Sequence, residues 1–334
     1  MIKIKELLKQ FASRLVELVK NNKPYALGVV VIILIIFGMY LLSRNRGKAE
    51  VVTFVNAPQN IDTVYKGQVD VKVDSGVSTK VVSKMPEIAL GHPVDNWFDS
   101  SRQVLIADAL GFSSKAVVLP SSTNPAWLED VRSLYIAKDI GEINFSTAFN
   151  LDSNIDHTNV PSQQIAVNAL NNFFTKTQLP ITGMNLDAVT AEYYYLDSTD
   201  TVTKVTSGTG PLIRLTIPFE IAGVPVIMPI ESYVYVDGTG TIKLMSLFIP
   251  NFEQTNPEMD VLSFASAQQK FQNGEFSVVK MRDDPSTQWL IDSIYPAYYI
   301  NQKDFYTLSK TRTLSPVYIF SSGDTTVAVE AADE

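Results

Sequence analysis

The sequence predicts an α+β fold, in which an N-terminal transmembrane helix precedes a domain of repeated helix-plus-antiparallel-sheet units. Three observations support this prediction. Residues 25–42 are apolar and uncharged, three later stretches have helical periodicity, and each of these is followed by strand-like runs. Glycine, asparagine and aspartate separate those runs, as expected for antiparallel connections.

The first element is the apolar run, which we predict to be a membrane anchor at residues 24–43. Its eighteen uncharged residues, 25–42, would reach about 27 Å as a helix, close to the ~30 Å hydrocarbon core of a bilayer. The run ends in Ser-Arg-Asn-Arg, which lacks the small residues of a cleavage site, so we expect no cleavage. The residues that represent this predicted anchor are Tyr25, Val31, Ile35, Phe37 and Leu42.

The charge distribution predicts the location. Residues 1–48 carry a net charge of +7 and the whole chain −8, so the remainder carries −15. The basic start favours a cytoplasmic N-terminus, with the acidic C-terminal domain extracytoplasmic and the chain single-pass in the cell membrane. The acidic domain argues against nucleic acid, because it would repel phosphate. The absence of cysteine excludes disulfides and fits a bacterial cell envelope.

Residues 1–23 have the pattern of a basic amphipathic helix. Apolar side chains, Phe11 and Leu15 among them, recur at three- and four-residue spacing. Two interpretations are open: the helix contacts the inner leaflet or a partner, or the basic residues only set the topology.

Residues 44–85 are predicted to be a juxtamembrane stalk that contains a strand, because valines alternate with charged residues at 69–74. Residues 86–158 form the predicted first α+β unit, with a helix in 100–112. Residues 159–330 form a second, larger region, with helices in 161–179 and 263–276.

The clearest hairpin is YVYVDGTGTIKLM, residues 233–245. Asp237 and Gly238 are predicted to supply the positive-φ turn positions between its alternating strands. The stretch before this hairpin, IPFEIAGVPVIMP, contains Pro218, Pro225 and Pro229. We therefore predict that it is an edge strand, bulged or looped.

These residues resemble a known group. ESYVYVDGTGTIKLM is similar to the closing strands of PepSY-type domains. SFASAQQKFQNGEF, IDSIYPAYYI and LSPVYIF resemble the C-terminal half of the YycH/YycI group of membrane-anchored extracytoplasmic regulators. The resemblance covers residues 160–325, and 99–150 weakly. It implies a regulatory or scaffolding role in the envelope, and it supplies no ligand and no catalytic residue.

Motifs for catalysis or metal binding are missing. The two histidines, His92 and His157, lie in turn-like sequence. The loop that begins at Asp152 has acidic or amide residues at alternate positions, as in a calcium loop. Its sixth residue is His157 where glycine is needed, and its twelfth is Gln163 where a glutamate is needed. We therefore predict no metal, no cofactor and no enzymatic activity.

The run Tyr193-Tyr194-Tyr195 is the candidate partner surface within the domain. In a strand, Tyr194 would face opposite to its neighbours, so one side packs in the core and the other can form a binding surface. The predicted function is a non-enzymatic envelope protein that binds the lipid bilayer through its anchor and regulates another envelope or membrane protein. The alternative is a cell-envelope hydrolase that uses carboxylates such as Glu129-Asp130 or Asp283-Asp284.

Overall fold

The computed structural model describes residues 70–79, 81–121, 124–147, 158–196, 202–206, 208–280, 288–301, 305, 312–322 and 325–332. All of these belong to one compact unit, Pro58–Glu334. The predicted amphipathic helix at 1–23 and the predicted anchor at 24–43 lie outside the described residues. Among the residues that are described, no helix is both long and apolar enough to cross a membrane.

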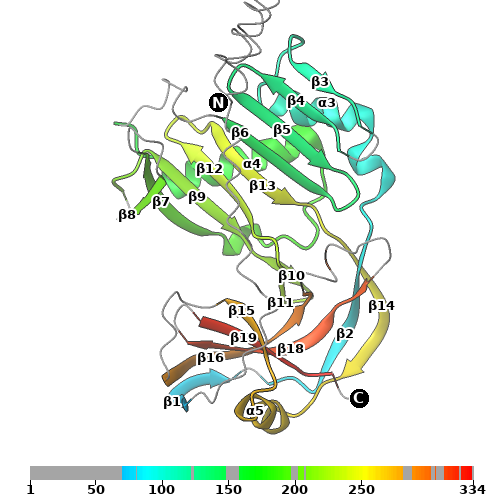
Figure 1. The fold of residues 1–334 in the computed structure, drawn as a ribbon, viewed down its shortest axis with the longest axis vertical. Helices are drawn as coiled ribbons and strands as arrows, with labels where there is room; N and C mark the ends of the chain where they lie inside the picture. The colour runs from blue at the N-terminus through cyan, green and yellow to red at the C-terminus, as the bar shows by residue number, and fades with distance from the viewer. Residues whose placement is uncertain are drawn as a thin grey trace, which may run out of the picture. The chain divides into compact units, whose positions relative to one another are not determined.

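The largest element is a nine-stranded antiparallel sheet (Figure 1). Its strands are β3 (Val117–Leu119), β4 (Ala126–Glu129), β5 (Arg132–Ala137), β6 (Glu142–Thr147), β7 (Thr190–Leu196), β8 (Val202–Val205), β9 (Leu212–Ile217), β12 (Ser232–Asp237) and β13 (Ile242–Phe248). Their order is β3-β4-β5-β6-β13-β12-β9-β7-β8. Strands from both sides of residue 158 therefore belong to this one sheet.

A seven-stranded mixed sheet holds most of the remaining strands. They are β1 (Asp70–Thr79), β10 (Phe219–Ile221), β11 (Val224–Ile227), β15 (Ser277–Lys280), β16 (Gln288–Tyr299), β18 (Ser315–Ser322) and β19 (Thr325–Glu330). β1 and β11 pair with β16 in parallel, and the other pairs are antiparallel. A small third sheet has the order β14-β2-β17, from Asn251–Asp260, Lys84–Gly91 and Arg312–Thr313.

Three α-helices occur in the described part of the chain: α3 (Ser100–Ala109), α4 (Gln163–Thr177) and α5 (Phe264–Gln272). Each begins after a residue whose side chain accepts a hydrogen bond from a backbone N–H of the first turn, namely Asp99, Ser162 and Ser263. Two short 3₁₀ helices, Asp95–Phe98 and Leu186–Ala188, also occur in the described residues.

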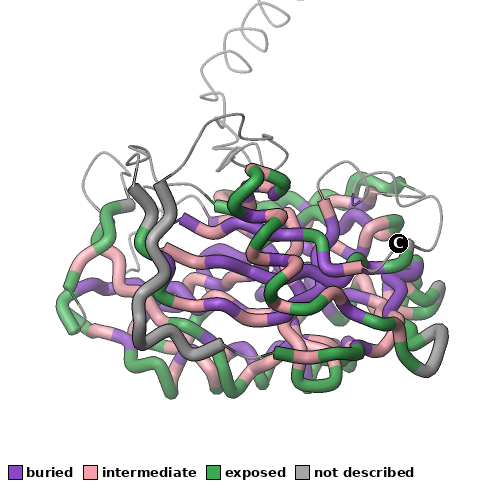
Figure 2. The backbone as a smooth tube through the Cα atoms, turned by 90° about the horizontal axis from the view of Figure 1, so that it is seen from below, coloured by how far each residue is buried: buried purple, intermediate pink, exposed green. Residues whose placement is uncertain are grey.

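One connected cluster of buried apolar side chains forms the core. It includes side chains from all three α-helices and from both large sheets. Figure 2 shows that buried residues follow the middle of the strands and that exposed residues gather in the connections. The two large sheets therefore share this main core, and each also carries a smaller separate cluster of buried apolar side chains.

The predicted fold class was wrong. The described chain is mostly β-sheet and contains no transmembrane helix, and it is not built from repeated helix-plus-sheet units. Helices α3 and α4 contact each other and share the core with one face of the nine-stranded sheet, whereas α5 contacts β19 of the other large sheet. The three helices were predicted at the right places. The strands of the two predicted units, however, pair with one another in a single sheet.

Two local predictions can be compared with the backbone. The positive-φ residue of the β12–β13 turn is Gly240, with φ 82°, and not Asp237 or Gly238. Gly238 is needed for another reason: a Cβ atom there would lie 2.1 Å from the backbone oxygen of Asn159. The proline-rich stretch forms an edge in part: Pro218 precedes β10, the terminal strand of its sheet, whereas Pro225 lies in β11, which pairs with both β10 and β16.

Candidate functional site

The nine-stranded sheet has one covered face and one open face. Alternate residues of β9 and β12, such as Ile213 and Val234, are buried against α4 and belong to the main core. No helix of the described residues packs on the outer face, which carries a separate, smaller apolar cluster. This outer face is the candidate site.

Three tyrosines meet on the outer face. Tyr194 of β7 lies opposite Leu212 of β9, and Tyr235 of β12 lies opposite Leu244 of β13. Strand alternation brings Tyr233 of β12 to the same side. We call these five residues the tyrosine cluster. Its ring centroids are 5.3 Å apart for Tyr194 and Tyr235 and 5.8 Å apart for Tyr233 and Tyr235, in tilted and edge-to-face geometry. The three rings therefore support one another.

Arg214 of β9 lies at the centre of this face. Its guanidinium carbon is 4.6 Å from the centroid of the Tyr233 ring, within the range of a cation–π contact. The same side chain forms an ion pair with Glu231, and its Nη1 lies 3.6 Å from Glu192 Oε2. Lys204 Nζ forms a second ion pair with Glu192 Oε1 at 2.5 Å. Two cations and two carboxylates thus balance each other beside the rings.

Protonation states follow from these contacts. Burial raises the pKa of Glu192, but hydrogen bonds from Lys204 and the Tyr194 hydroxyl outweigh it, so this pKa lies below its usual value. Burial also raises the pKa of the Tyr235 phenol well above its usual value. At neutral pH the cluster therefore presents neutral phenols beside a compensated ionic group.

The structure separates the three tyrosines that the sequence singled out. Tyr193 packs against the main core, Tyr194 belongs to the tyrosine cluster, and Tyr195 is 45% exposed. Of the later tyrosines, Tyr298 is buried in the core with its hydroxyl donating to the carbonyl of Pro86. The other predicted contact residues, including Phe11 and Leu15 and those of the anchor, lie outside the described residues.

Sequence reasoning missed Arg214, Tyr233 and Tyr235. The available signal was the alternation in SYVYVD and LIRLTI, which places the tyrosines on one side of their strand and the arginine between apolar residues. The sequence pattern does not show that β9 pairs with β12, and this pairing places Tyr235 opposite Arg214.

Metal binding has no candidate among the described residues, in which no group of three histidine, cysteine or acidic side chains lies close together. His92 is exposed in the connection after β2, and its carbonyl accepts a hydrogen bond from Asn251. His157 and the calcium-like loop at 152–156 lie outside the described residues, so the prediction of no metal stays a prediction.

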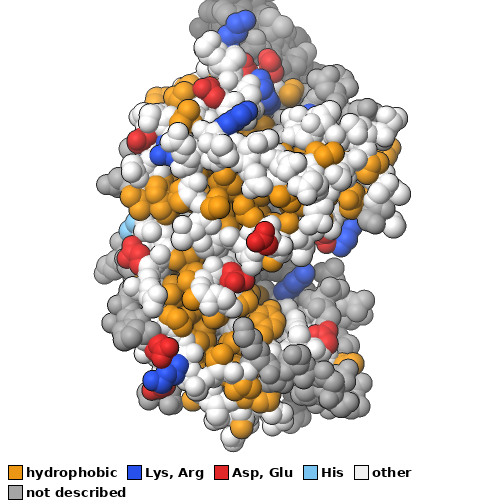
Figure 3. Space-filling model, turned by 180° about the vertical axis from the view of Figure 1, so that it is seen from behind, with side chains coloured by type: hydrophobic (Ala, Val, Ile, Leu, Met, Phe, Trp, Pro, Cys, Tyr) orange, Lys and Arg blue, Asp and Glu red, His pale blue; other side chains and the backbone are white. Residues whose placement is uncertain are grey.

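Apolar side chains also occur on the opposite side of the molecule. Figure 3, drawn from behind Figure 1, shows separate hydrophobic patches with acidic and basic residues scattered between them. Apolar surface alone therefore does not identify a site. The combination of three contacting tyrosines and a central arginine does distinguish the outer face, because these residue types are enriched at protein–protein interfaces.

Comparisons with known proteins found only distant structural likenesses. No family model and no curated protein matches the chain. An uncharacterized protein from Eubacterium rectale has a TM-score of 0.44 and 10% identity, over 82% of this chain and 94% of its own. The C-terminal domain of YpeB from Bacillus megaterium has a TM-score of 0.33 and 8% identity, over 72% of this chain and 94% of its own.

These likenesses are too weak to carry an argument about function. At a TM-score of 0.33 the YpeB domain carries no argument for the PepSY-type part of the sequence resemblance. Neither neighbour is described as a YycH or YycI protein, so that part of the resemblance is not shown.

Proposed function

We propose that this chain is a non-enzymatic binding module of the bacterial cell envelope, and that its tyrosine cluster binds another envelope or membrane protein. The observation that supports the proposal most is the outer sheet face, on which Tyr194, Tyr233 and Tyr235 surround Arg214. Tyrosine contributes a large contact area to interfaces at a low entropy cost, and both tyrosine and arginine are frequent among interface hot spots.

The chemistry of this face defines the partner. Arg214 and Lys204 are balanced by Glu192 and Glu231, so the face offers little net charge for steering an ionic ligand. Its rings offer apolar surface, and its phenols offer neutral hydrogen-bond groups. The proposed partner is therefore a protein that presents an apolar patch with peptide or amide groups at its border.

The location of this activity is a second part of the proposal. The uncharged stretch 25–42 and the contrast between +7 and −15 support a chain anchored in the cell membrane, with residues 58–334 outside the cytoplasm. The bilayer is then its first partner, and the protein bound at the tyrosine cluster is the second.

The alternative, a hydrolase, is not favoured by the carboxylates that are described. Hydrogen bonds from Ser113 hold the pKa of Glu129 below its usual value, whereas a general acid needs a raised pKa. Burial does raise the pKa of Glu142, but its carboxylate oxygen lies by the Ser246 hydroxyl, at 3.4 Å, and not by a second carboxylate. Asp283 and Asp284 lie outside the described residues.

The test uses two neighbouring tyrosines that differ in the face they occupy. A photo-reactive amino acid is placed at position 194 or 195 of the full-length chain in the native cell, and crosslinked proteins are identified by mass. In parallel, Tyr194→Ala is expected to weaken capture of the crosslinked protein about tenfold or more, in the range of an interface hot spot. Tyr195→Ala is the matched control, because it lies beside Tyr194 but outside the cluster.

Thermal unfolding of each variant checks that the fold is intact. Crosslinking from position 194 alone, with loss of capture only in Tyr194→Ala, supports the proposal. Equal effects at both positions, or an effect confined to position 195, would contradict it.

A further inference from the structure

A cavity lies on the covered side of the nine-stranded sheet, away from the tyrosine cluster. Its volume is about 490 Å³, within the range of small-molecule sites. It lies between the end of α3, the second half of α4, β6, and the β4–β5 and β12–β13 turns. The lining residues used below are Phe145, Phe173, Ile242, Arg132, Lys176 and Lys243.

One part of the cavity is apolar. Phe145 and Phe173 are nearly fully buried, and Ile242 and Ala169 are half-buried beside them. These side chains come from strands and a helix of the core, so their positions are set by packing. They can accept an aromatic or aliphatic body of modest size.

Lys243 lines the polar part as the positive end of a buried ion pair. Its Nζ lies 3.3 Å from Asp237 Oδ2, and the residues are 6% and 3% exposed. Asp237 is not part of the lining, and its other oxygen accepts hydrogen bonds from Thr239 and Thr241 in the turn. The register of β12 and β13 shifts at this point, so that Ile242 and Lys243 both reach the cavity.

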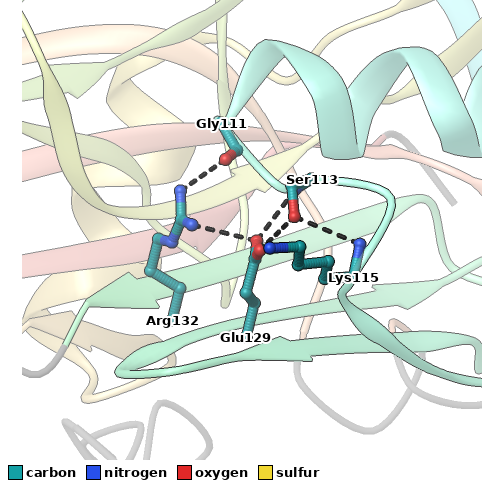
Figure 4. Close-up of polar contacts among 5 residues, drawn as sticks. All are labelled: Gly111, Ser113, Lys115, Glu129 and Arg132. Atoms are coloured by element: carbon teal, nitrogen blue, oxygen red, sulfur yellow. Dashed lines mark hydrogen bonds and ion pairs between the residues drawn. The ribbon is translucent and has the colours of Figure 1, made fainter.

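Arg132 is a second lining cation with a carboxylate partner, and Figure 4 shows its contacts. Its Nη2 donates to Glu129 Oε2 at 2.9 Å and its Nη1 donates to the Gly111 carbonyl, while its guanidinium lies 5.3 Å from the Phe112 ring centroid. Glu129 in turn accepts from the backbone N–H of Ser113 at 2.8 Å and from its hydroxyl. Arg132 lines the cavity and Glu129 does not. As with Lys243 and Asp237, the cation of the pair reaches the cavity and the carboxylate lies behind it.

Two helix ends near the cavity would by themselves favour a cation, since the carbonyls at a helix C-terminus carry partial negative charge. Both are neutralised. Arg132 holds the Gly111 carbonyl after α3, and Arg102 donates to the carbonyls of Thr177, at 2.8 Å, and Gln178 at the end of α4. The helix dipoles therefore do not cancel the positive lining.

Lys176 adds a full positive charge at the rim. It lies in the last turn of α4, is exposed, and makes no hydrogen bond or ion pair with the residues that the structure describes. Asp130 is the one carboxylate of the lining, and it is exposed in the β4–β5 turn. Of the three cations in the lining, Lys243 and Arg132 have carboxylate partners behind the wall, Asp237 and Glu129, so Lys176 supplies the positive charge that no described carboxylate pairs with.

We propose that this cavity binds a small amphipathic carboxylate. Its apolar body packs against Phe145, Phe173 and Ile242, and its carboxylate lies near Lys243 and Lys176. The same chemistry is available from a free aryl or alkyl carboxylic acid and from the C-terminal residue of a peptide. This site does not depend on the function proposed for the tyrosine cluster.

The experiment is calorimetric titration of the purified full-length chain with 4-phenylbutyrate and, as the uncharged match, 4-phenylbutyramide. The carboxylate is expected to bind more tightly than the amide, with an affinity that falls as salt is added. Lys176→Gln is expected to weaken carboxylate binding about two- to fivefold, the range of an exposed ion pair, and to leave amide binding unchanged.

Two further variants separate charge from shape. Lys270→Gln is the matched control, because Lys270 occupies the last turn of α5, away from the cavity, and no effect is expected. Ala169→Phe fills the apolar part and is expected to abolish binding of both probes, with the fold checked by circular dichroism. A second titration uses a short peptide that ends in phenylalanine, with a free or an amidated C-terminus.

The results decide the proposal and the source of the ligand. Tighter binding of the free-terminus peptide than of 4-phenylbutyrate assigns a peptide terminus, and the reverse assigns a free acid. Equal binding of the carboxylate and the amide overturns the proposal, as does equal loss in Lys176→Gln and Lys270→Gln. Absence of binding by both carboxylate probes overturns it as well.

Discussion

The buried pair Asp237–Lys243 allows the most direct energetic test of this fold. Asp237→Asn keeps the size of the side chain and an acceptor for the turn, but removes the negative charge. Lys243, 6% exposed, then carries a buried charge that has lost its carboxylate. Breaking a buried pair from one side costs about 3–5 kcal/mol, because the remaining charge is left uncompensated.

We expect the lower end of that range, about 3 kcal/mol, for Asp237→Asn. The 3.3 Å separation of Nζ and Oδ2 is long for an ion pair, and the asparagine oxygen can still accept from the backbone N–H groups of Thr239 and Thr241. The double variant Asp237→Asn/Lys243→Met removes both charges and keeps an unbranched apolar stem, so it should cost only about 1 kcal/mol.

The assay is urea unfolding followed by far-ultraviolet circular dichroism for the parent chain, both single variants and the double variant. The coupling energy of the cycle is expected to be about 2 kcal/mol or more. If the two single effects add, or if Asp237→Asn costs less than about 1 kcal/mol, the charge on Lys243 is not held by Asp237. The assigned orientation of this pair in the cavity wall would then be wrong.

Two more predictions concern the β16 region. Burial raises the pKa of Tyr298 to about 12, and its hydroxyl donates to the Pro86 carbonyl, so Tyr298→Phe should cost about 1 kcal/mol at pH 7. The phenol ionises at about pH 10 in the unfolded chain but only at about pH 12 in the folded chain, so the parent chain loses stability between these pH values. The difference in unfolding free energy between the parent chain and Tyr298→Phe should therefore shrink from pH 10 to pH 12. Urea unfolding at both pH values measures this difference. A fragment that starts at Met85 lacks β1 and therefore the pairing of β1 with β16, whereas a fragment that starts at Pro58 keeps both. In the same assay the longer fragment should be more stable by about 2–4 kcal/mol. Equal stability of the two fragments would contradict this prediction.

The helices could be predicted from the sequence because their signals are local. Ser162 and Ser263 stand at the starts of α4 and α5, and Gly111 follows α3 with φ 83°. Each signal lies within a few residues of the element it defines. The same holds for the hairpin of β12 and β13, although its positive-φ position was assigned to the wrong residues.

The sheets could not be predicted, because their pairings are not local. β6 pairs with β13, with Ser146 opposite Leu244, and β1 pairs in parallel with β16, with Asp70 opposite Gln288. A period-two pattern shows that a strand has two faces but not which strand lies beside it. Grouping each helix with the strands that follow it was therefore a reasonable inference from sequence order, and it failed where distant strands joined one sheet.

The candidate site was likewise predictable only where the signal in the sequence is local. Tyr194 was singled out from sequence because three tyrosines stand together, and the alternation correctly placed it opposite in direction to Tyr193. Arg214 carried no comparable signal. Its role depends on β9 lying between β7 and β12, which brings Glu192 and Tyr233 to either side of it.

The sheet itself makes the two proposed sites separable in experiments. β13 contributes Leu244 to the tyrosine cluster on one face and Lys243 to the cavity on the other, because consecutive strand residues point in opposite directions. A substitution at Tyr194 leaves the cavity lining intact, and one at Lys176 leaves the tyrosine cluster intact. Each variant is therefore a control for the other site. If Lys176→Gln lowered partner capture without changing the fold, binding at the two faces would be coupled through the sheet, whose strands β9 and β12 contact α4.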